Sequence, residues 1–387
     1  MVYGHDAIAV SLSDLRVPAE ARLPHTGSFA LTLPALGAGV GALTHAWPLP
    51  ALRASALCAG LAAAAPPEPP LGPLPRATAP TPELQAALAA LVQGIADPAH
   101  RRACAPLLYL ACAIFLGPHS APHLPGLALT VQPPTLPVGA GLGSSAAVST
   151  AAAAALLGAH AAASWPTPLN AAAREAINAW AFAAETLFHG APSGLDNTVA
   201  THGGALVYSR AGGVPRFRAL ASALPLRLLL VNTHVPKDTA ALVAGVGALR
   251  AAHPGLVTPL LECIGALVGE AAGVLEGAAP APGAAALPSA PTPQAHLAQL
   301  IRINHSVLNA LGVGHAALDA VVAAAAELGL AGKLTGAGGG GCAFVLLPAA
   351  GEGEAQEAAL TATLTAKGFH CFSTRVGGDG VAVELLP

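Results

Sequence analysis

A glycine- and serine-rich run at residues 137–150, Pro-Val-Gly-Ala-Gly-Leu-Gly-Ser-Ser-Ala-Ala-Val-Ser-Thr, contains residue types that bind phosphate. It follows a strand expected at 127–131 and precedes an alanine-rich helix expected at 146–157. Alternate glycines let the backbone turn tightly and bring N–H groups close to a ligand, and a helix N-terminus adds partial positive charge. The order of loop and helix therefore favours phosphate, although an ordinary surface turn can have the same composition.

Ser144 and Ser145 stand at the expected start of this helix. A hydroxyl there can cap the helix, contact a phosphate oxygen or coordinate a magnesium ion. Two other phosphate-binding loops are excluded. A Walker-type loop ends in Gly-Lys-Ser/Thr, and the run has no lysine. A dinucleotide-binding loop requires an acidic residue about twenty positions further on, and residues 158–165 contain none.

Two carboxylates come later in the chain. Apolar residues recur at helical spacing over 172–189 and place Glu185 away from their stripe, on a polar face where a solvated glutamate is the ordinary case. Asp196 follows a turn formed by Pro-Ser-Gly at 192–194. It is either a turn residue or a carboxylate held beside a reacting hydroxyl.

A second glycine loop, Thr-Gly-Ala-Gly-Gly-Gly-Gly, occupies residues 335–341. It matches the Gly-x-Gly-x-x-Gly pattern, but it is expected to follow a helix and precede a strand at 342–347, the reverse of the dinucleotide-binding order. We expect its backbone to approach a ligand or the first glycine loop closely.

The composition excludes several classes of protein. A length of 387 residues is sufficient for two domains. Charged residues make up 10% and the formal net charge is −3, so no basic field favours nucleic acid. The longest apolar run, 104–116, is too short to span a bilayer and predicts a buried helix.

The six cysteines are dispersed without a Cys-x-x-Cys pair, which is typical of reduced thiols in a cytosolic protein. Pro122 separates His119 from His123, so these two cannot share a regular helix face and a catalytic zinc site is disfavoured. A buried strand is expected at 224–231, and from there helices alternate with strands to the end of the chain. We therefore place the domain boundary at about residue 222. The other expected elements are a strand at 7–10, proline-rich loops at 59–82 and 277–293, and helices from near Ala240, at 300–311 and at 316–328.

Together these segments resemble the GHMP kinases, small-molecule kinases with a glycine-serine phosphate loop. The resemblance covers residues 2–384 and is specific in five segments, which are 137–147, 177–197, 232–245, 304–319 and 333–342. Within that superfamily, Asn-Ala-Leu-Gly-Val-Gly-His at 309–315 and the second glycine loop are similar to the mevalonate kinase family. The resemblance implies an α+β, two-domain GHMP kinase fold. Residues 1–222 would form a ribosomal-protein-S5-like N-terminal domain for nucleotide and substrate, and residues 223–387 a ferredoxin-like C-terminal domain.

The same resemblance implies ATP-dependent phosphorylation of mevalonate at its 5-hydroxyl, a step of isoprenoid and sterol biosynthesis, with ATP and Mg2+ as cofactors. Asp196 would receive or orient the hydroxyl proton, Thr239 would border the substrate pocket, and Ser145 and Glu185 would bind Mg2+. The nucleotide phosphates would contact Gly139, Ala140, Gly141, Leu142, Gly143, Ser144 and Ser145 in the first loop and Gly336, Gly338, Gly339 and Gly340 in the second.

One departure accompanies this resemblance. Members of the family begin with a strand carrying Ala-Pro-Gly-Lys and, a few residues later, Gly-Glu-His, and residues 2–5 align just after both motifs. By the resemblance, that lysine would hold Asp196 ionised and attract the transferring phosphate. We therefore expect an incomplete N-terminus. Two alternatives stay open: a GHMP kinase for another small alcohol, and a non-catalytic homologue that binds nucleotide without transferring phosphate.

The expected partner is the small-molecule substrate, with neither nucleic acid nor a membrane. Relatives of this family are often dimers, so the resemblance allows a homodimer. A cytoplasmic location is expected, with peroxisomal or plastid targeting left open because the N-terminus is expected to be incomplete.

Overall fold

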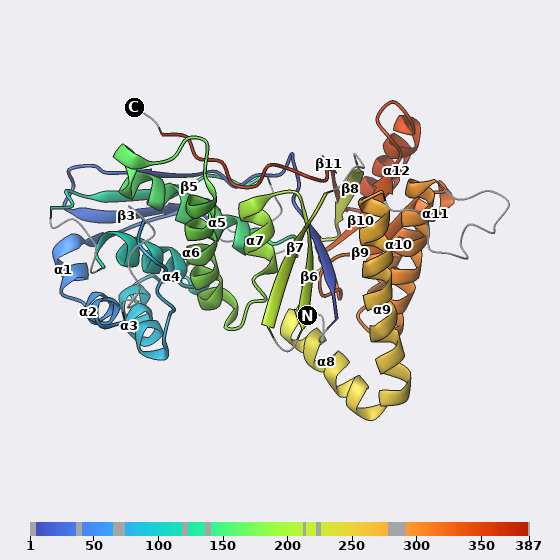
Figure 1. The fold of residues 1–387 in the computed structure, drawn as a ribbon, viewed down its shortest axis with the longest axis horizontal. Coiled ribbons are helices and arrows are strands. Elements are labelled where there is room, and N and C mark those ends of the chain that lie inside the picture. The colour runs from blue at the N-terminus through green and yellow to red at the C-terminus, as the bar shows by residue number, and fades with distance from the viewer. Residues whose placement is uncertain are drawn as a thin grey trace. The chain divides into compact units, whose positions relative to one another are not determined.

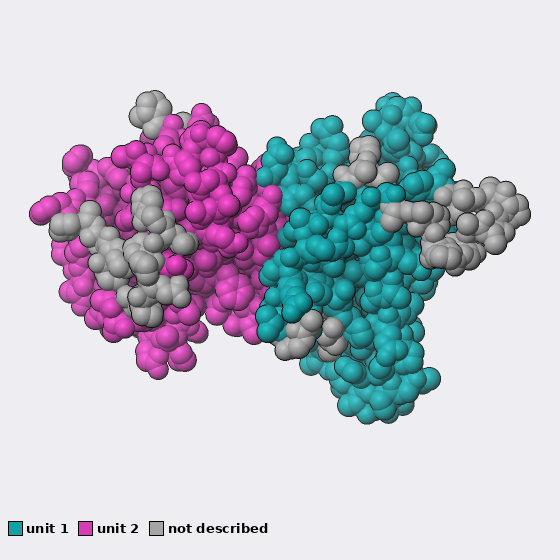
Figure 2. All heavy atoms as spheres, in the orientation of Figure 1, with its two compact units in different colours: residues 1–15, 139–142, 203–379 teal, residues 16–138, 143–202, 380–387 magenta. Residues whose placement is uncertain are grey.

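The computed structural model describes residues 5–35, 41–64, 74–117, 123–135, 141–211, 214–221, 226–277 and 292–385. The chain forms two compact units that interleave along the sequence, and Figure 2 colours them separately. The N-terminal unit comprises residues 16–138, 143–202 and 380–387, and the C-terminal unit comprises 1–15, 139–142 and 203–379. The expected sequence boundary at about residue 222 stays a prediction.

A four-stranded sheet in the order β2-β5-β3-β4 underlies the N-terminal unit. Its strands are β2 (Ala19–Arg22), β5 (Leu127–Val131), β3 (Ser28–Leu33) and β4 (Leu43–Pro48). β5 runs parallel to β3 and antiparallel to β2, and β4 is antiparallel to β3. Alternate residues of β3 and β5 are buried, so one face of the sheet supports the hydrophobic core. The strand predicted at 127–131 is confirmed.

Helices complete this unit (Figure 1). They are α1 (Leu49–Arg53), α2 (Ala56–Ala63), α3 (Pro82–Val92), α4 (Pro98–Phe115), α5 (Ser144–His160), α6 (Ala171–His189) and α7 (Leu195–His202), with a 3-10 turn at Ala162–Ser164. The buried helix predicted at 104–116 is α4, which keeps Pro106 inside it. Asp97 caps α4 by accepting hydrogen bonds from two backbone N–H groups, which accounts for its earlier start.

The α5 and α6 helices pack against each other and carry the site described below. α5 consists largely of alanine, and small side chains let neighbouring helices approach closely. The Asn170 side chain caps the start of α6, and Gly190, with a φ of 74°, ends it. Both helices were predicted, whereas α7 was expected only as a turn followed by an apolar segment.

The C-terminal unit contains two antiparallel sheets. The smaller has the order β1-β6-β7, with β1 at Ala7–Val10, β6 at Ala205–Ala211 and β7 at Val214–Leu220. The larger has the order β11-β8-β10-β9, with β11 (His370–Arg375), β8 (Arg227–Asn232), β10 (Cys342–Leu347) and β9 (Ala331–Leu334). Each neighbouring pair of the larger sheet is antiparallel, which with its helical crossovers is the predicted ferredoxin-like arrangement.

The helices of this unit are α8 (Thr239–Ala252), α9 (Pro254–Leu275), α10 (Pro293–Ala310), α11 (Ala316–Glu327) and α12 (Glu354–Ala366). α10 begins seven positions before the predicted start at residue 300, because Thr292 caps it and Pro293 occupies its first turn. Among the described helices, α9 has the length and apolarity of a membrane span. In this unit α9 packs on α8 and α10. The expectation of no membrane partner stays a prediction.

The second glycine loop joins two strands of the larger sheet. It leaves β9 at Leu334 and enters β10 at Cys342, and the two strands pair as antiparallel neighbours. The expectation that it follows a helix directly was wrong. The short strand β9 was missed because four residues with a central Gly-Lys pair carry little of the alternation that marks a strand.

Candidate active site

The first glycine loop enters α5 through Gly143, whose backbone is left-handed with a φ of 71°. A Cβ built on Gly143 would lie 3.6 Å from the Cγ of Asp196 and 3.9 Å from its Oδ1. The Asp196 carboxylate therefore lies beside the N-terminus of α5, where backbone N–H groups and the helix dipole favour negative charge. Gly139 and Ala140 of the same loop lie outside the described residues.

Asp196 is held in place through helix α7. Leu195 N–H donates to Ser193 Oγ at 3.2 Å, and Thr198 Oγ1 donates to the carbonyl of Gly194 at 2.5 Å. Asn197 Nδ2 donates to Oδ1 of Asn178 on α6 at 2.6 Å. These bonds fix the first turn of α7 against α6 while the Asp196 side chain itself stays exposed. An exposed carboxylate on a fixed backbone can meet a ligand that arrives from solvent.

Glu185 lies in the interior of the unit with only 4% of its surface exposed, so the interpretation of a solvated glutamate, the ordinary case for a polar helix face, was wrong. Ser145 Oγ donates to its Oε2 at 3.1 Å, and Ser149 Oγ donates to its Oε1 at 3.0 Å. Both serines come from α5, one turn apart. The polar face of α6 therefore meets a polar stripe on an otherwise apolar neighbour, which the periodicity of α6 alone could not reveal.

Burial raises the pKa of Glu185 to about 7, although the hydrogen bonds from Ser149 and Ser145 lower it. The nearby charge of Asp196 raises this pKa further. A buried carboxylate that is costly to ionise gains from a cation. His189 Nε2 lies 3.0 Å from Ser145 Oγ and 3.6 Å from Glu185 Oε2, one helical turn after Glu185. Ser145, Glu185 and His189 thus converge at the start of α5.

The oxygen donors of this cluster suit a magnesium ion. In the described part of the chain, no group of three or more His, Cys, Asp or Glu side chains could hold a metal ion. Mg2+ needs fewer protein ligands, because it is usually bound by one or two carboxylates together with waters and substrate phosphates. A hydroxyl and a buried carboxylate fit that demand. Binding of Mg2+ at Ser145 and Glu185 therefore stays a prediction with a suitable donor set.

A lysine lies against the first glycine loop within the C-terminal unit. A Cβ built on Gly141, whose φ is 81°, would lie 1.8 Å from Nζ of Lys237. A Cβ built on Gly336 would lie 3.5 Å from the same ammonium and 3.4 Å from the carbonyl oxygen of Gly141. The two glycine loops therefore approach each other as predicted, with the Lys237 ammonium between their backbones.

Other glycines of the second loop pack against the protein itself. A Cβ on Gly338 would lie 2.1 Å from the carbonyl oxygen of Val313, and one on Gly340 would lie 2.7 Å from that of Val235. The N–H of Gly339 donates to Val313 O at 2.9 Å, and the N–H of Gly338 donates to Thr335 O at 3.3 Å. These bonds occupy the N–H groups of Gly338 and Gly339. The expected contact of Gly338, Gly339 and Gly340 with phosphate stays a prediction.

Thr239 is the first residue of α8, and its side chain is exposed. Asp238 caps this helix by accepting a hydrogen bond from Ala241 N–H at 3.0 Å. The expected role of Thr239 at the substrate pocket stays a prediction.

Sequence reasoning missed three residues of these clusters, namely Ser149, His189 and Lys237. Ser149 follows Ser145 by four positions, and His189 follows Glu185 by four, so helical spacing could have found both. Lys237 is one of three lysines in the chain, and it lies between a buried strand and a helix start. Its scarcity is the one signal that the sequence offered for it.

Comparisons with known proteins show which family this chain belongs to. The family model for the GHMP kinases N terminal domain matches residues 108–204, and that for the GHMP kinases C terminal matches residues 294–366. Mevalonate kinase of Bos taurus is 44% identical over 299 residues, which are 74% of this chain and 70% of the relative. The chain belongs to the mevalonate kinases of the GHMP family. Mevalonate kinase of Homo sapiens is 43% identical over 67% of this chain and 64% of its own length.

Solved structures show the same fold. L. major mevalonate kinase in complex with R-mevalonate has a TM-score of 0.62 and 22% identity, over 99% of this chain and 92% of its own. The Methanococcus jannaschii mevalonate kinase has a TM-score of 0.64 and 19% identity, over 97% and 92%. The predicted α+β, two-domain GHMP kinase fold is confirmed. Membership of this family also makes the chain a kinase of a small molecule, with ATP as the expected phosphoryl donor.

Proposed function

We propose that this chain transfers the γ-phosphoryl group of ATP to the primary 5-hydroxyl of mevalonate, giving 5-phosphomevalonate and ADP. The hydroxyl oxygen forms the new bond to phosphorus, the bond from phosphorus to the β-phosphate oxygen breaks, and the hydroxyl proton leaves. The kinship with mevalonate kinases supports this substrate. The position of the Asp196 carboxylate beside Gly143 is the structural observation that carries the proposal.

Asp196 receives or orients the hydroxyl proton in this proposal. Its carboxylate lies at the N-terminus of α5, where the N–H groups of the first glycine loop are expected to bind the transferring phosphate. A carboxylate close to the acceptor oxygen favours attack by holding its lone pair toward phosphorus. The bond from Asn197 to Asn178 holds α7 against α6 and keeps this geometry.

Ser145 and Glu185 would hold Mg2+. Bound there, the ion would neutralise charge on the nucleotide phosphates. Ser149 then has a supporting role. Its hydroxyl donates to Oε1 of Glu185, and Oε2 of the same carboxylate faces Ser145. The ionised form of Glu185 is the one that binds a cation, so its raised pKa makes metal affinity sensitive to pH near neutrality.

Lys237 supplies positive charge to the phosphate loop. Its ammonium lies against Gly141, and Gly141 is joined to Gly143 through Leu142 alone. Positive charge placed there before reaction stabilises the charge that develops on the phosphoryl oxygens.

The proposal is tested by offering the purified chain ATP and Mg2+ with a panel of acceptors, namely R-mevalonate, 5-phosphomevalonate, galactose and homoserine, and measuring ADP release. We expect R-mevalonate to give the highest kcat/KM. Asp196→Asn, which keeps the shape of the side chain, is the matched control and should release ADP far more slowly. Good turnover of another alcohol without turnover of mevalonate would replace the proposed substrate, and binding of ATP without any turnover would support a non-catalytic homologue.

We further propose a cytoplasmic location and a homodimer. All six cysteines are free, and Cys58, Cys104, Cys112 and Cys342 are buried, which suits a reducing compartment. The homodimer rests on the family resemblance, and sedimentation of the purified chain would test it.

A further inference from the structure

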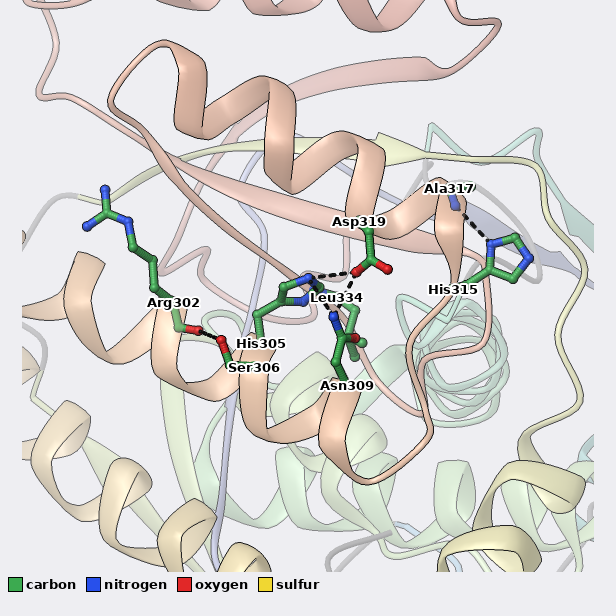
Figure 3. A network of polar contacts seen from close by, with 8 residues as sticks. All are labelled: Arg302, His305, Ser306, Asn309, His315, Ala317, Asp319 and Leu334. Carbon is green, nitrogen blue, oxygen red and sulfur yellow. Dashed lines mark hydrogen bonds and ion pairs between the residues drawn. The ribbon is translucent and has the colours of Figure 1, made fainter.

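A buried histidine on α10 is joined to the base of the second glycine loop. His305 is 7% exposed, and the backbone N–H of Leu334 donates to its Nδ1 at 3.4 Å. Leu334 is the last residue of β9 and directly precedes the glycine loop. Figure 3 shows this contact together with the side chains around it.

The hydrogen bonds define the tautomer of His305. Nδ1 accepts from Leu334, so the ring proton resides on Nε2, which donates to Oδ1 of Asp319 at 3.1 Å. Asn309 Nδ2 donates to the same Asp319 oxygen at 2.8 Å. The network therefore links α10, α11 and β9.

Two further contacts hold the same region. Lys333 Nζ donates to the carbonyl oxygen of Leu334 at 2.8 Å, so both polar backbone atoms of Leu334 are bound by side chains. Gly339 N–H donates to Val313 O in the connection between α10 and α11. A Cβ on Gly314 of that connection would lie 2.3 Å from Oδ1 of Asn309, so the connection packs directly on the network.

We propose that the His305–Asp319–Asn309 network positions the second glycine loop so that Gly336 meets Lys237 and the first glycine loop. His305 is a positioning residue in this account, because it acts through Leu334 and touches neither substrate nor phosphate. The inference rests on the proposed role of the two loops in binding nucleotide. It adds that a side chain remote from the loop tip, His305, determines nucleotide affinity through its bond to Leu334.

Two substitutions at one position separate the two bonds of His305. Asparagine places an oxygen near the position of Nδ1 and keeps an acceptor for Leu334, whereas glutamine reaches the position of Nε2 and keeps a donor for Asp319. If the bond to Leu334 sets the loop, His305→Asn should bind ATP nearly as the unmodified chain does. His305→Gln leaves a buried N–H without its partner, and its ATP affinity should fall on the order of tenfold.

The experiment measures the dissociation constant of ATP by calorimetry and the amide hydrogen exchange of residues 333–342 for both variants. Leu300→Ala, a buried substitution on α10 outside the network, is the control for general loss of stability. We expect faster exchange and weaker ATP binding in His305→Gln alone. Equal exchange and equal ATP affinity in the asparagine and glutamine variants would overturn the inference, and so would a loss of affinity in Leu300→Ala as large as that in His305→Gln.

Failure of the proposed mevalonate phosphorylation can be distinguished from failure of the positioning role of His305. If mevalonate is not phosphorylated, the exchange of residues 333–342 still distinguishes the two variants, because it requires neither acceptor nor turnover. If mevalonate is phosphorylated at equal KM for ATP by both variants, the proposed function stands and the positioning role of His305 fails.

Discussion

Replacing Gly141 with alanine tests whether Lys237 acts beside the first glycine loop. The new Cβ would lie 1.8 Å from Nζ and 2.7 Å from Cε of Lys237, so the ammonium must withdraw by more than about 1 Å to reach ordinary contact. Lysine is flexible, so the protein can accommodate this shift at little cost in folding. A displacement of about 1 Å in a charge that stabilises the transition state can reduce the rate by about 10²-fold.

A second effect of the substitution needs its own control. Gly141 has a φ of 81°, where an alanine costs about 1–2 kcal/mol in backbone strain. Gly329 has a φ of 74° with no atom within 4 Å of a built Cβ, and it lies in the same unit. Gly329→Ala therefore carries the strain without the displacement. We expect similar losses of thermal stability in both variants and a loss of activity in Gly141→Ala alone.

The assay is kcat/KM for ATP at saturating mevalonate, measured for Gly141→Ala, Lys237→Met and the double variant. If alanine at 141 acts by displacing Lys237, the double variant should be no slower than Lys237→Met, because both substitutions remove the same contact. Lys237→Arg keeps the charge and should retain more activity than Lys237→Met. Independent, multiplying losses in the double variant, or full activity in Gly141→Ala, would refute the placement of Lys237 at the phosphate.

Three further predictions concern the carboxylates of α6 and α7. At limiting Mg2+, activity should fall as the pH is lowered through about 7, because protonated Glu185 cannot bind the ion. Glu185→Gln should lose Mg2+ affinity at every pH. An unchanged Mg2+ titration of this variant would contradict the assignment of Glu185 as a magnesium ligand. In the absence of metal, Glu185 has a folded pKa of about 7 against 4.5, so its own contribution to stability is fully present below pH 4.5 and about 3 kcal/mol of it is lost as the pH rises through 7. Denaturant unfolding across this pH range checks that slope, which Glu185→Gln should remove. Asp196→Asn should lower kcat by about 10²–10⁴-fold with little change in ATP affinity, and a variant that loses ATP binding instead would show that Asp196 serves the nucleotide.

Local sequence patterns predicted many of the elements that carry the site. The strand at 127–131, the alanine-rich helix that became α5, and the strand at 342–347 formed as expected from their local composition, because their neighbours reinforce the local preference. The short helix α7 and the short strand β9 were missed. Each is set by contacts from elsewhere: Asn178 on α6 fixes Asn197, and β10 supplies the partner of β9.

The environment of Glu185 could not be predicted from the sequence of its own helix. Its position off the apolar stripe predicted solvent, but α5 presents Ser145 and Ser149 to it across a buried interface. Lys237 illustrates the same limit over a longer distance in sequence. Nothing within the first glycine loop reveals a lysine that reaches Gly141 from almost a hundred residues further along the chain.

The account is tested most directly by identifying the product of ATP and R-mevalonate by phosphorus NMR, with Asp196→Asn beside the unmodified chain. We expect one phosphomonoester, coupled to the methylene protons at C5, formed in equal amount with ADP and nearly absent for the variant. ATP hydrolysis without a phosphorylated acceptor, phosphate on another oxygen of mevalonate, or equal product from Asp196→Asn would contradict the proposed reaction.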